Sequence, residues 1–403
     1  MIIKKIVIFL PAPYRGGSMQ GAKNIAKMLL LGSTGANEPV EIVFSCLKET
    51  YNVNQEFSDL LALGIQVRET EWKIISKNEA QIALDFTQNE KILSHESYCL
   101  PYDGINNFCD CDFWLIVSDR TSAPLLPIKP YGMIIYDYIQ RYIPDIFGQD
   151  EGKLDLPFLY SARNANLILC TTPQTREDTI QYAGIDENKV LLVPMEFNPL
   201  KYEVKPFLQK DSPYFIWTSN ATQHKNHKNA LKALELYYEK FDGKLKVLMT
   251  GVQTELFQKR NTNQIPYIVE IRDTIQKSAV LKNNITILGE LSESQYISVL
   301  SGAEFLFHPV LYDNGTFSVI EAAYHSVPSA SSNYPQMRYI NERFNLNIEF
   351  FDPRKPQMIA SVLKNMENNI FSLKESLPTK ESLECHTYDK LSGKYWSLLR
   401  NYL

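Results

Sequence analysis

The chain has 403 residues, 44% of them hydrophobic and 22% charged, with a net charge of −5. This is the composition of an ordinary globular protein, and the length exceeds a typical single core, so we expect two domains of about 200 residues each. The absence of a basic block argues against a nucleic-acid-binding protein. No apolar run is long enough for a membrane span, and the start, MIIKKIVIFLPAP, lacks a small-residue cleavage site, which predicts a first β-strand rather than a signal peptide.

In the first half of the chain, short apolar strands alternate with longer amphipathic stretches, the pattern of parallel βαβ units. Strands are expected at residues 5–10, 41–46, 113–117, 133–137, 167–171 and 190–193, and helices at 20–31, 156–164 and 173–182. Residues 69–110 are polar and aperiodic, and we expect an elaborated insertion there.

The pattern restarts in the second half, after a segment with four prolines, residues 194–213, that reads as a linker. Strands are expected at residues 214–218, 245–250, 285–288, 305–308, 329–331 and 348–351, and helices at 227–238, 267–278, 293–301, 317–324 and 356–366. The tail, TYDKLSGKYWSLLRNYL, has the pattern of an amphipathic helix. We therefore divide the chain into domains at 1–198 and 199–380 and a final helix at 381–403.

The six cysteines, at positions 46, 99, 109, 111, 170 and 385, show no metal-binding pattern. The pair Cys109 and Cys111 has no second pair at metal spacing, so free thiols near a strand start are the favoured interpretation. Free thiols suit a reducing cytoplasm. The spelling D-x-D at Asp110 and Asp112 lies at the same expected strand start, and we do not interpret it as a metal-binding loop.

The most informative segment runs from residue 304 to residue 332. An apolar strand leads into a turn containing glycine, then a helix, then a second strand. Two carboxylates, Asp313 and Glu321, lie eight positions apart across this turn. Strand, polar turn and helix form phosphate- and sugar-binding crevices in parallel α/β sheets. The same pattern also occurs in α/β proteins where the acidic residues are merely solvated, and spacing alone does not separate these readings.

This segment resembles the E-x7-E element of retaining family-4 glycosyltransferases of the GT-B fold, commonly written EGFGLPxLEAMACGxPVxAS. Asp313 stands at the first Glu and Glu321 at the second, and Ala322, Val327-Pro328 and Ser331-Ser332 keep the pattern. The resemblance implies that Glu321 accepts hydroxyls of the nucleotide ribose and that Asp313 holds hydroxyls of the donor hexose. It implies a donor-binding turn made by Asn314, Gly315, Thr316, Phe317, Ser318 and Val319, whose N–H groups contact the hexose and, at Ser318 and Val319, the diphosphate.

The segment FIWTSNATQHKNHKNALKAL resembles the family's GRLxxxKGxxxLLxA, in which an Arg and a Lys hold the diphosphate. Lys225 matches the Lys, Asn226 the Gly after it, and Asn220 the Arg, so one positive charge is missing. His224 could supply a hydrogen-bond donor beside Lys225. The alternative, a metal pair of His224 and His227, has no further His or Cys cluster to support it.

The first domain carries weaker resemblances. The loop PAPYRGGSMQGAKNIAKML resembles the glycine-rich first loop of GT-B transferases, with Gly17 the expected point of close approach, and it is not a G-x-G-x-x-G fingerprint. The run MIIYDYIQRYIPDIF resembles HDxxPxxxP, with Tyr136 at the His and Asp137 at the Asp, and both are expected on the acceptor side. Residues 162–198 and 285–309 also resemble the family, where Gly289 would shape a loop near the nucleobase.

Together these resemblances imply an α/β protein of the GT-B fold, two Rossmann-like domains whose last helix crosses back to the first. A surface helix of the second domain explains the tail equally well. The implied function is retaining hexosyl transfer from a nucleoside-diphosphate sugar to a saccharide or lipid-linked saccharide in cell-surface polysaccharide synthesis, without a metal cofactor. The alternatives are an inactive GT-B binding or partner subunit, an epimerase and a phosphorylase.

We expect a cytoplasmic protein with peripheral contact at the inner membrane face as an option. Lys4, Lys5, Lys23 and Lys27 could form a basic face for such contact. A helix packed on the sheet explains the same residues.

Overall fold

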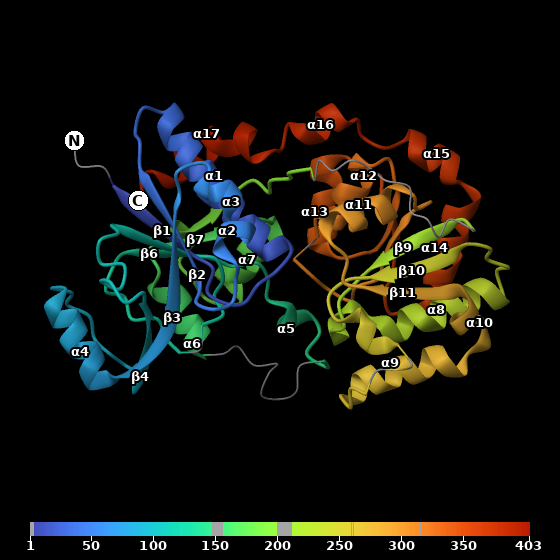
Figure 1. Cartoon of the computed structure of the whole chain (residues 1–403), viewed down its shortest axis with the longest axis horizontal. Coiled ribbons are helices and arrows are strands. Elements are labelled where there is room, and N and C mark those ends of the chain that lie inside the picture. The colour runs from blue at the N-terminus through green and yellow to red at the C-terminus, as the bar shows by residue number, and fades with distance from the viewer. Residues whose placement is uncertain are drawn as a thin grey trace. The chain divides into compact units, whose positions relative to one another are not determined.

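The computed structural model describes residues 4–121, 123–146, 156–199, 212–258, 260, 262–314 and 316–403. The chain divides into two compact units. One contains Met1–Gln140, Gln149–Glu196 and Cys385–Leu403, and the other contains Arg141–Gly148 and Phe197–Glu384. Each unit is a largely parallel sheet with helices packed on it (Figure 1). The predicted α/β class with two Rossmann-like domains is confirmed.

The first unit is built on an eight-stranded sheet of order β4-β3-β2-β1-β5-β6-β7-β8. Its strands are β1 (Lys5–Phe9), β2 (Glu41–Leu47), β3 (Gln66–Ser76), β4 (Ser97–Tyr102), β5 (Phe113–Ile116), β6 (Tyr131–Ile134), β7 (Leu167–Cys170) and β8 (Val190–Leu192). Its helices are α1 (Gly17–Gly35), α2 (Val53–Glu56), α3 (Ser58–Leu61), α4 (Lys77–Phe86), α6 (Leu156–Asn164), α7 (Pro173–Gln181), a 3-10 helix at Glu187–Lys189, and α17 (Tyr388–Leu399); the short α5 (Ile139–Tyr142) crosses between the units.

Both faces of this sheet are buried, which explains the continuous apolar runs of its strands. In β1, Ile6 and Ile8 belong to one core cluster while Val7 and Phe9 belong to another on the opposite face. Val7 pairs with residues of β2 and β5 on its two sides, in parallel register. A central parallel strand covered on both faces has no solvent-facing side, so hydrophobic residues occupy successive positions.

The expected insertion at residues 69–110 is an ordered extension of the sheet edge. β3 pairs in parallel with β2 as far as Thr70 and then pairs antiparallel with β4, from Glu71 opposite Tyr102 to Ser76 opposite Ser97. Ser76 and Glu79 form a reciprocal capping box that starts α4. That S-x-x-E spacing is a helix-start signal in the sequence. The strands escaped detection because β3 is half exposed and lacks a clear alternation.

The second unit is built on a six-stranded, all-parallel sheet of order β11-β10-β9-β12-β13-β14. Its strands are β9 (Tyr214–Thr218), β10 (Lys246–Thr250), β11 (Ile285–Gly289), β12 (Leu306–His308), β13 (Ser329–Ser332) and β14 (Glu349–Phe351). Its helices are α8 (His227–Glu239), α9 (Pro266–Lys277), α10 (Ala279–Asn284), α11 (Glu293–Ser301), α12 (Ser318–Tyr324), α13 (Pro335–Phe344), α14 (Pro356–Asn368), α15 (Ile370–Glu375) and α16 (Lys380–Glu384), with 3-10 helices at Gln223–Lys225 and Thr254–Phe257.

The C-terminal helix α17 packs against α1 of the first unit (Figure 1), so the last helix does return to the first domain. Gly32 of α1 permits this contact, since a Cβ there would lie 2.3 Å from the carbonyl oxygen of Ser392 and 2.7 Å from Cβ of Trp396. The Trp396 indole donates to Glu38 (2.6 Å) and the Tyr395 hydroxyl to the carbonyl of Pro194 (2.9 Å). The alternative of a surface helix on the second domain is therefore wrong.

The basic face suggested by the sequence does not form. Lys23 and Lys27 are 8% and 6% exposed, and both bind the carboxylate of Asp59, at 2.7 and 2.6 Å. These two lysines are part of the contact between α1 and α3 rather than of a cationic surface. In the part of the chain that the structure describes, no helix is both long and apolar enough to cross a membrane.

Candidate functional site

The second sheet has a topological switch point between β9 and β12. The chain moves from β9 outward through β10 to β11 and then returns to the other side of β9 as β12. Ligands of open parallel sheets bind outside the carboxyl ends of the strands at such a point. The loops that follow β9 and β12 are joined there, because the N–H of Leu311 donates to the carbonyl of His224 (2.8 Å). The switch point therefore brings the two strongest sequence motifs together.

Lys225 and Asp313, 88 positions apart in the sequence, form an ion pair at this point, with 2.5 Å between Nζ and Oδ2. Their side chains are 15% and 20% exposed. The N–H of Asn314 also donates to Asp313 Oδ1 (2.8 Å). Burial, the largest single influence, raises the pKa of Asp313, but the charge and hydrogen bond of Lys225 together with the neighbouring His224 and His308 lower it overall. Asp313 is consequently an ionised carboxylate at neutral pH, next to a cation.

Asn226, the residue at the family's Gly position, fixes the loop that carries Lys225. Its backbone is left-handed (φ 65°, ψ 31°), a conformation that Gly and Asn adopt with little strain. The buried side-chain amide donates to the carbonyls of Pro309 and Pro353, both at 2.8 Å. Asn226 thereby does what a glycine could not, because its side chain ties together the loops that follow β9, β12 and β14.

Asn220 and His224 shape the same loop but supply no positive charge. Asn220 Oδ1 accepts from the N–H of Thr222 (3.2 Å) and from its hydroxyl, and the Thr222 hydroxyl lies 3.1 Å from His224 Nδ1. Burial, helped by the charge of Lys225, lowers the pKa of His224 to about 4. The imidazole is therefore neutral at pH 7, and Lys225 is the cation of this loop.

His227 is a structural residue rather than a metal ligand. It is fully buried, and its two ring nitrogens lie 2.9 Å from the hydroxyl of Ser219 and 2.7 Å from that of Tyr267. Burial lowers its pKa to about 3. Across the described parts of the chain, no three or more His, Cys, Asp or Glu residues are grouped so that they could hold a metal ion.

The D-x-D spelling is also accounted for by structural contacts. Asp110 binds Arg68 through two hydrogen bonds (2.6 and 2.9 Å) and Lys5 at 2.9 Å, and these contacts lower its pKa. Asp112 accepts from the N–H of Lys5 (2.8 Å). Both carboxylates precede β5 and so lie at the amino edge of the first sheet, opposite the edge at which ligands bind.

Glu321 lies in the first turn of α12 and accepts a hydrogen bond from the hydroxyl of Tyr296 (3.1 Å). Burial raises the pKa of Glu321 to about 7, with Glu293 adding to the rise and Tyr296 opposing it. The turn before α12 is ordered by Thr316, whose hydroxyl accepts from the N–H of Ser318 (3.3 Å). The N–H that was expected to contact the diphosphate is thus engaged within the turn, and Gly315 lies outside the described residues.

Two further residues of the second unit occupy the same carboxyl edge. Gly289 ends β11 with a positive φ of 74°, which favours glycine, and its carbonyl accepts from Gly251 N–H (3.0 Å) and the Thr250 hydroxyl (2.8 Å). Tyr312, which precedes Asp313, stacks on Tyr142 with ring centroids 4.0 Å apart and planes 10° apart. Tyr142 belongs to the second unit although it comes from the first half of the sequence.

In the first unit, the expected acceptor-side residues follow the carboxyl ends of the central strands. Gly17 opens α1 after β1, and Tyr136 and Asp137 follow β6. The hydroxyl of Tyr136 is buried and has no hydrogen-bond partner among the described residues. It would lie 3.3 Å from a Cβ placed on Gly21. The Tyr136 hydroxyl is therefore enclosed by the protein, although the residue as a whole is half-buried.

Two further residues of the first unit are Asp137 and Glu196, the second of which was not selected from the sequence. Asp137 Oδ1 accepts from the N–H of Ile139 (3.2 Å), which orders the turn after β6. Glu196 is 4% exposed, with its Oε1 4.0 Å from a Cβ placed on Gly21. Tyr142 and Tyr296 lie within segments that resemble the family, but nothing in those segments singled them out.

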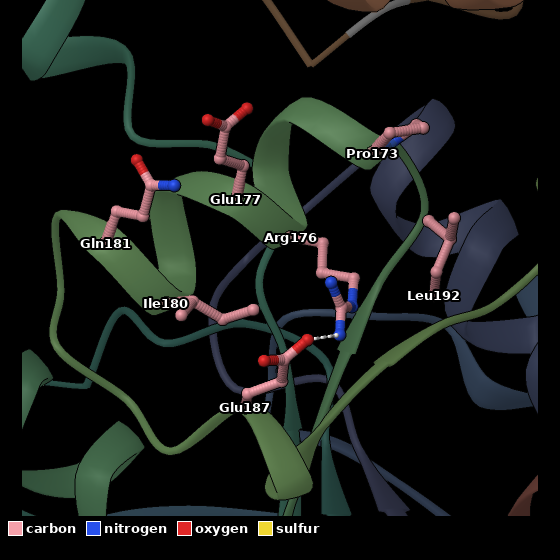
Figure 2. A pocket seen from close by; sticks show the side chains of 7 residues that line it. All are labelled: Pro173, Arg176, Glu177, Ile180, Gln181, Glu187 and Leu192. Atoms are coloured by element: carbon pink, nitrogen blue, oxygen red, sulfur yellow. Dashed lines mark hydrogen bonds and ion pairs between the residues drawn. The ribbon is translucent and has the colours of Figure 1, made fainter.

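Two hollows on the surface of the described parts of the chain lie away from these residues. Figure 2 shows one of about 540 Å³ on the first unit, lined by Pro173, Arg176, Glu177, Ile180, Gln181, Glu187 and Leu192, with an ion pair between Arg176 and Glu187 (2.7 Å). Another, of about 720 Å³, lies at the start of α14. Neither contains a residue expected from the sequence, so the candidate site rests on the geometry of the loops.

Comparison with known proteins gives one family match and several solved structures of similar fold. Residues 201–377 match the family model described as glycosyl transferases group 1. Anabaena HepE in complex with UDP and glucose has 12% identity and a TM-score of 0.66, covering 99% of this chain and 100% of that one. Sucrose-phosphate synthase from Thermosynechococcus elongatus has 12% identity and a TM-score of 0.63, with 99% and 98% covered. The lipopolysaccharide outer core galactosyltransferase WaaB has 12% identity and a TM-score of 0.58, with 100% of both chains covered.

No curated protein matches the sequence. The structural likenesses cover the whole chain at low identity and therefore establish the fold, GT-B. The match over residues 201–377 contains Lys225, Asp313 and Glu321. Together, the family match and the fold support a glycosyltransferase.

Proposed function

We propose that this chain transfers a hexose from a nucleoside-diphosphate sugar to a saccharide or lipid-linked saccharide acceptor, with retention of anomeric configuration. The observation that carries the proposal is the ion pair of Lys225 and Asp313 at the switch point of the second sheet. A sugar nucleotide has an anionic diphosphate bonded directly to a hydroxyl-rich ring. Adjacent cationic and anionic groups at the carboxyl edge of the sheet match these two chemical parts.

Lys225 is the group that we assign to the diphosphate. As the bond from the sugar to the diphosphate breaks, negative charge grows on the leaving phosphate, and a preorganised cation stabilises that charge. The side-chain hydrogen bonds of Asn226 fix the loop that carries Lys225, and Asp313 binds the amino group of Lys225. In the donor complex its amino group would contact the phosphate as well as, or instead of, Asp313.

We assign the two sugar rings of the donor to the two carboxylates. Asp313, kept ionised by Lys225, accepts hydrogen bonds from hexose hydroxyls, and Glu321, oriented by Tyr296, accepts them from the ribose. Structures of Anabaena HepE contain UDP, glucose and UDP-glucose, which makes UDP-sugars the first donors to examine here. Asn314 and Thr316 to Val319 complete the donor-binding turn.

The reaction that we propose takes place on one face of the sugar. The bond between the anomeric carbon and the phosphate oxygen breaks, the acceptor oxygen bonds to the same carbon, and its proton passes to the departing phosphate. A double-displacement route would need a carboxylate nucleophile and a second carboxyl group about 5 Å away. Asp313 is bound to Lys225, so it is a poor nucleophile. We assign Gly17 and Asp137, with the ring of Tyr136, to the acceptor side.

The proposed process is cell-surface polysaccharide synthesis at the cytoplasmic face, with no metal cofactor. A thermal-shift panel of UDP-, GDP- and ADP-sugars tests the donor. A donor present at 100 times its Kd should stabilise the chain by about 2.7 kcal/mol, which corresponds to about 5–10 °C for a unit of this size. The product's anomeric configuration, read by NMR, then tests retention. The absence of stabilisation by every sugar nucleotide would contradict the proposal.

A further inference from the structure

Two buried side chains at the start of α13 lack the hydrogen bonds that buried polar groups normally have. Tyr334 is 4% exposed, and its hydroxyl has no partner among the described residues. Gln336 is fully buried, and neither its amide oxygen nor its amide nitrogen has a partner within the described ranges. Each such group destabilises a protein by about 1–3 kcal/mol. Native proteins contain few of them, so three unsatisfied atoms on two neighbouring residues need an explanation.

The position of these residues suggests the explanation. They follow β13, which pairs directly with β12, so the loops after both strands leave the same edge of the sheet. The Tyr334 ring lies 5.4 Å from that of Tyr312, the residue before Asp313. Burial raises the pKa of Tyr334 well above its usual range, and the negative charge of Asp313 adds to the rise. The Tyr334 ring therefore packs beside the residue that immediately precedes the carboxylate assigned to the hexose.

We infer that Tyr334 and Gln336 are specificity-determining residues of the donor site that hydrogen-bond the hydroxyls of an uncharged hexose beside Asp313. This inference rests on the proposed function. A tyrosine hydroxyl can donate and accept, and a glutamine amide offers two donors and an acceptor, which suits neighbouring sugar hydroxyls.

The charge of the site selects between classes of hexose. Both residues are uncharged, and Asp313 is an anion whose cationic neighbour is assigned to the diphosphate. A hexuronate carboxylate placed here would be repelled by Asp313, whereas a hydroxyl could donate a hydrogen bond to it. The structure thus favours neutral hexoses over hexuronates as the transferred sugar.

Tyr334 belongs to a row of three tyrosine rings in contact with one another. Tyr312 lies between Tyr142, on which it stacks, and Tyr334. Offset or stacked aromatic contacts add about 0.5–1.5 kcal/mol beyond the burial of their area. Tyr334 is in addition fixed at the N-terminus of α13, immediately before Pro335. The hydroxyl of Tyr334 is therefore held in one place, as a specificity contact requires.

The test uses Tyr334→Phe and Gln336→Leu, which remove only the polar groups, with Tyr339→Phe as control. Tyr339 is a half-buried residue of the same helix. Calorimetry measures binding of the sugar nucleotide that stabilises the wild type, of the free nucleoside diphosphate, and of the matching hexuronate nucleotide. We expect both variants to bind the sugar nucleotide about 3- to 10-fold more weakly, with unchanged affinity for the free diphosphate. The wild type should bind the hexuronate nucleotide at least about 10-fold more weakly than its neutral counterpart.

Thermal unfolding without ligand separates this role from a structural one. Removing an unsatisfied hydroxyl should leave the Tm of Tyr334→Phe equal or raise it, whereas loss of a structural bond to a buried water would lower it. Unchanged sugar-nucleotide affinity, equal losses for diphosphate and sugar nucleotide, or a lowered Tm in Tyr334→Phe would each overturn the inference. If the wild type binds no sugar nucleotide, the proposed function fails and the inference with it. If it binds one and Tyr334→Phe retains that affinity, the inference alone fails.

Discussion

We expect Glu321 to lower the free energy of unfolding of the second unit at neutral pH, because the candidate site holds its carboxylate in a buried environment. Its pKa is about 7 in the folded protein, against an ordinary value of 4.5, mainly because burial disfavours the charged form. Between these two values the folded chain retains a proton that the unfolded chain releases. Stability therefore decreases as pH rises from about 4.5 to about 7 and is constant, as far as this group is concerned, on either side.

The size of the effect follows from the shift. A change from 4.5 to about 7 is about 2.5 pH units, or about 3.4 kcal/mol at 1.36 kcal/mol per unit. Because the side chain is only partly buried, solvent reduces this figure, and we expect about 1–2 kcal/mol. Glu321→Gln removes the titration but keeps the shape. Relative to the wild type, the variant should therefore gain about 1–2 kcal/mol between pH 5 and pH 8, or about 2–8 °C in Tm.

Thermal unfolding of the wild type and of Glu321→Gln at pH 5 and pH 8 checks this expectation. Glu290→Gln, a change at an exposed position of the same unit, is the control and should run parallel to the wild type. Transfer activity of Glu321→Gln should fall by about 10²-fold, since the charged acceptor is lost. If the difference in Tm between wild type and Glu321→Gln is the same at both pH values, Glu321 titrates normally and the argument from burial is refuted.

Three further predictions concern the phosphate contact, the metal and the C-terminal helix. Lys225→Ala should weaken binding of the free nucleoside diphosphate, measured by calorimetry, by about 10-fold because a charged hydrogen bond is lost. Lys228→Ala, a change at an exposed position, is the control and should bind as the wild type does. Equal affinities in all three proteins would show that Lys225 does not contact the phosphates. Dialysis against EDTA should leave transfer activity unchanged, and a loss restored by Mn²⁺ would show that a metal takes part. Gly32→Ala should lower the Tm by several degrees because its methyl group would overlap Ser392. Gly35→Ala is the control and should have little effect, because there is open space around Gly35. A normal Tm for Gly32→Ala would mean that α1 and α17 separate easily.

Local pattern was sufficient for most of the secondary structure. The central strands, such as Tyr214–Thr218 and Phe113–Ile116, are apolar because both faces are covered, and this signal is independent of what covers them. The two motifs that supply Lys225 and Asp313 were likewise visible as strand, turn and helix. Asn226 has a left-handed backbone, which Asn tolerates nearly as well as Gly, so the match of Asn226 to the family's Gly position could also be made from the sequence.

Where the sequence failed, the deciding contact lay elsewhere in the chain. The prediction ended the first helix at residue 31, while α1 continues to Gly35 because α17 packs against Gly32. Lys23 and Lys27 allowed either a cationic face or a helix packed on the sheet, and only their contacts with Asp59 distinguish the two. The half-exposed β3 has no pattern of its own and is a strand because β2 and β4 pair with it.

The sequence by itself indicated the fold class, most of the strands and helices, and the two carboxylates and lysine of the candidate site. These follow from hydrophobic periodicity and from short motifs, which are properties of neighbouring residues. Only the tertiary structure decided that Lys225 contacts Asp313, that Tyr296 orients Glu321 and that Tyr334 lies beside the site. Those contacts arise because β12 enters the sheet between β9 and β13, and strand order is set by packing across the whole unit.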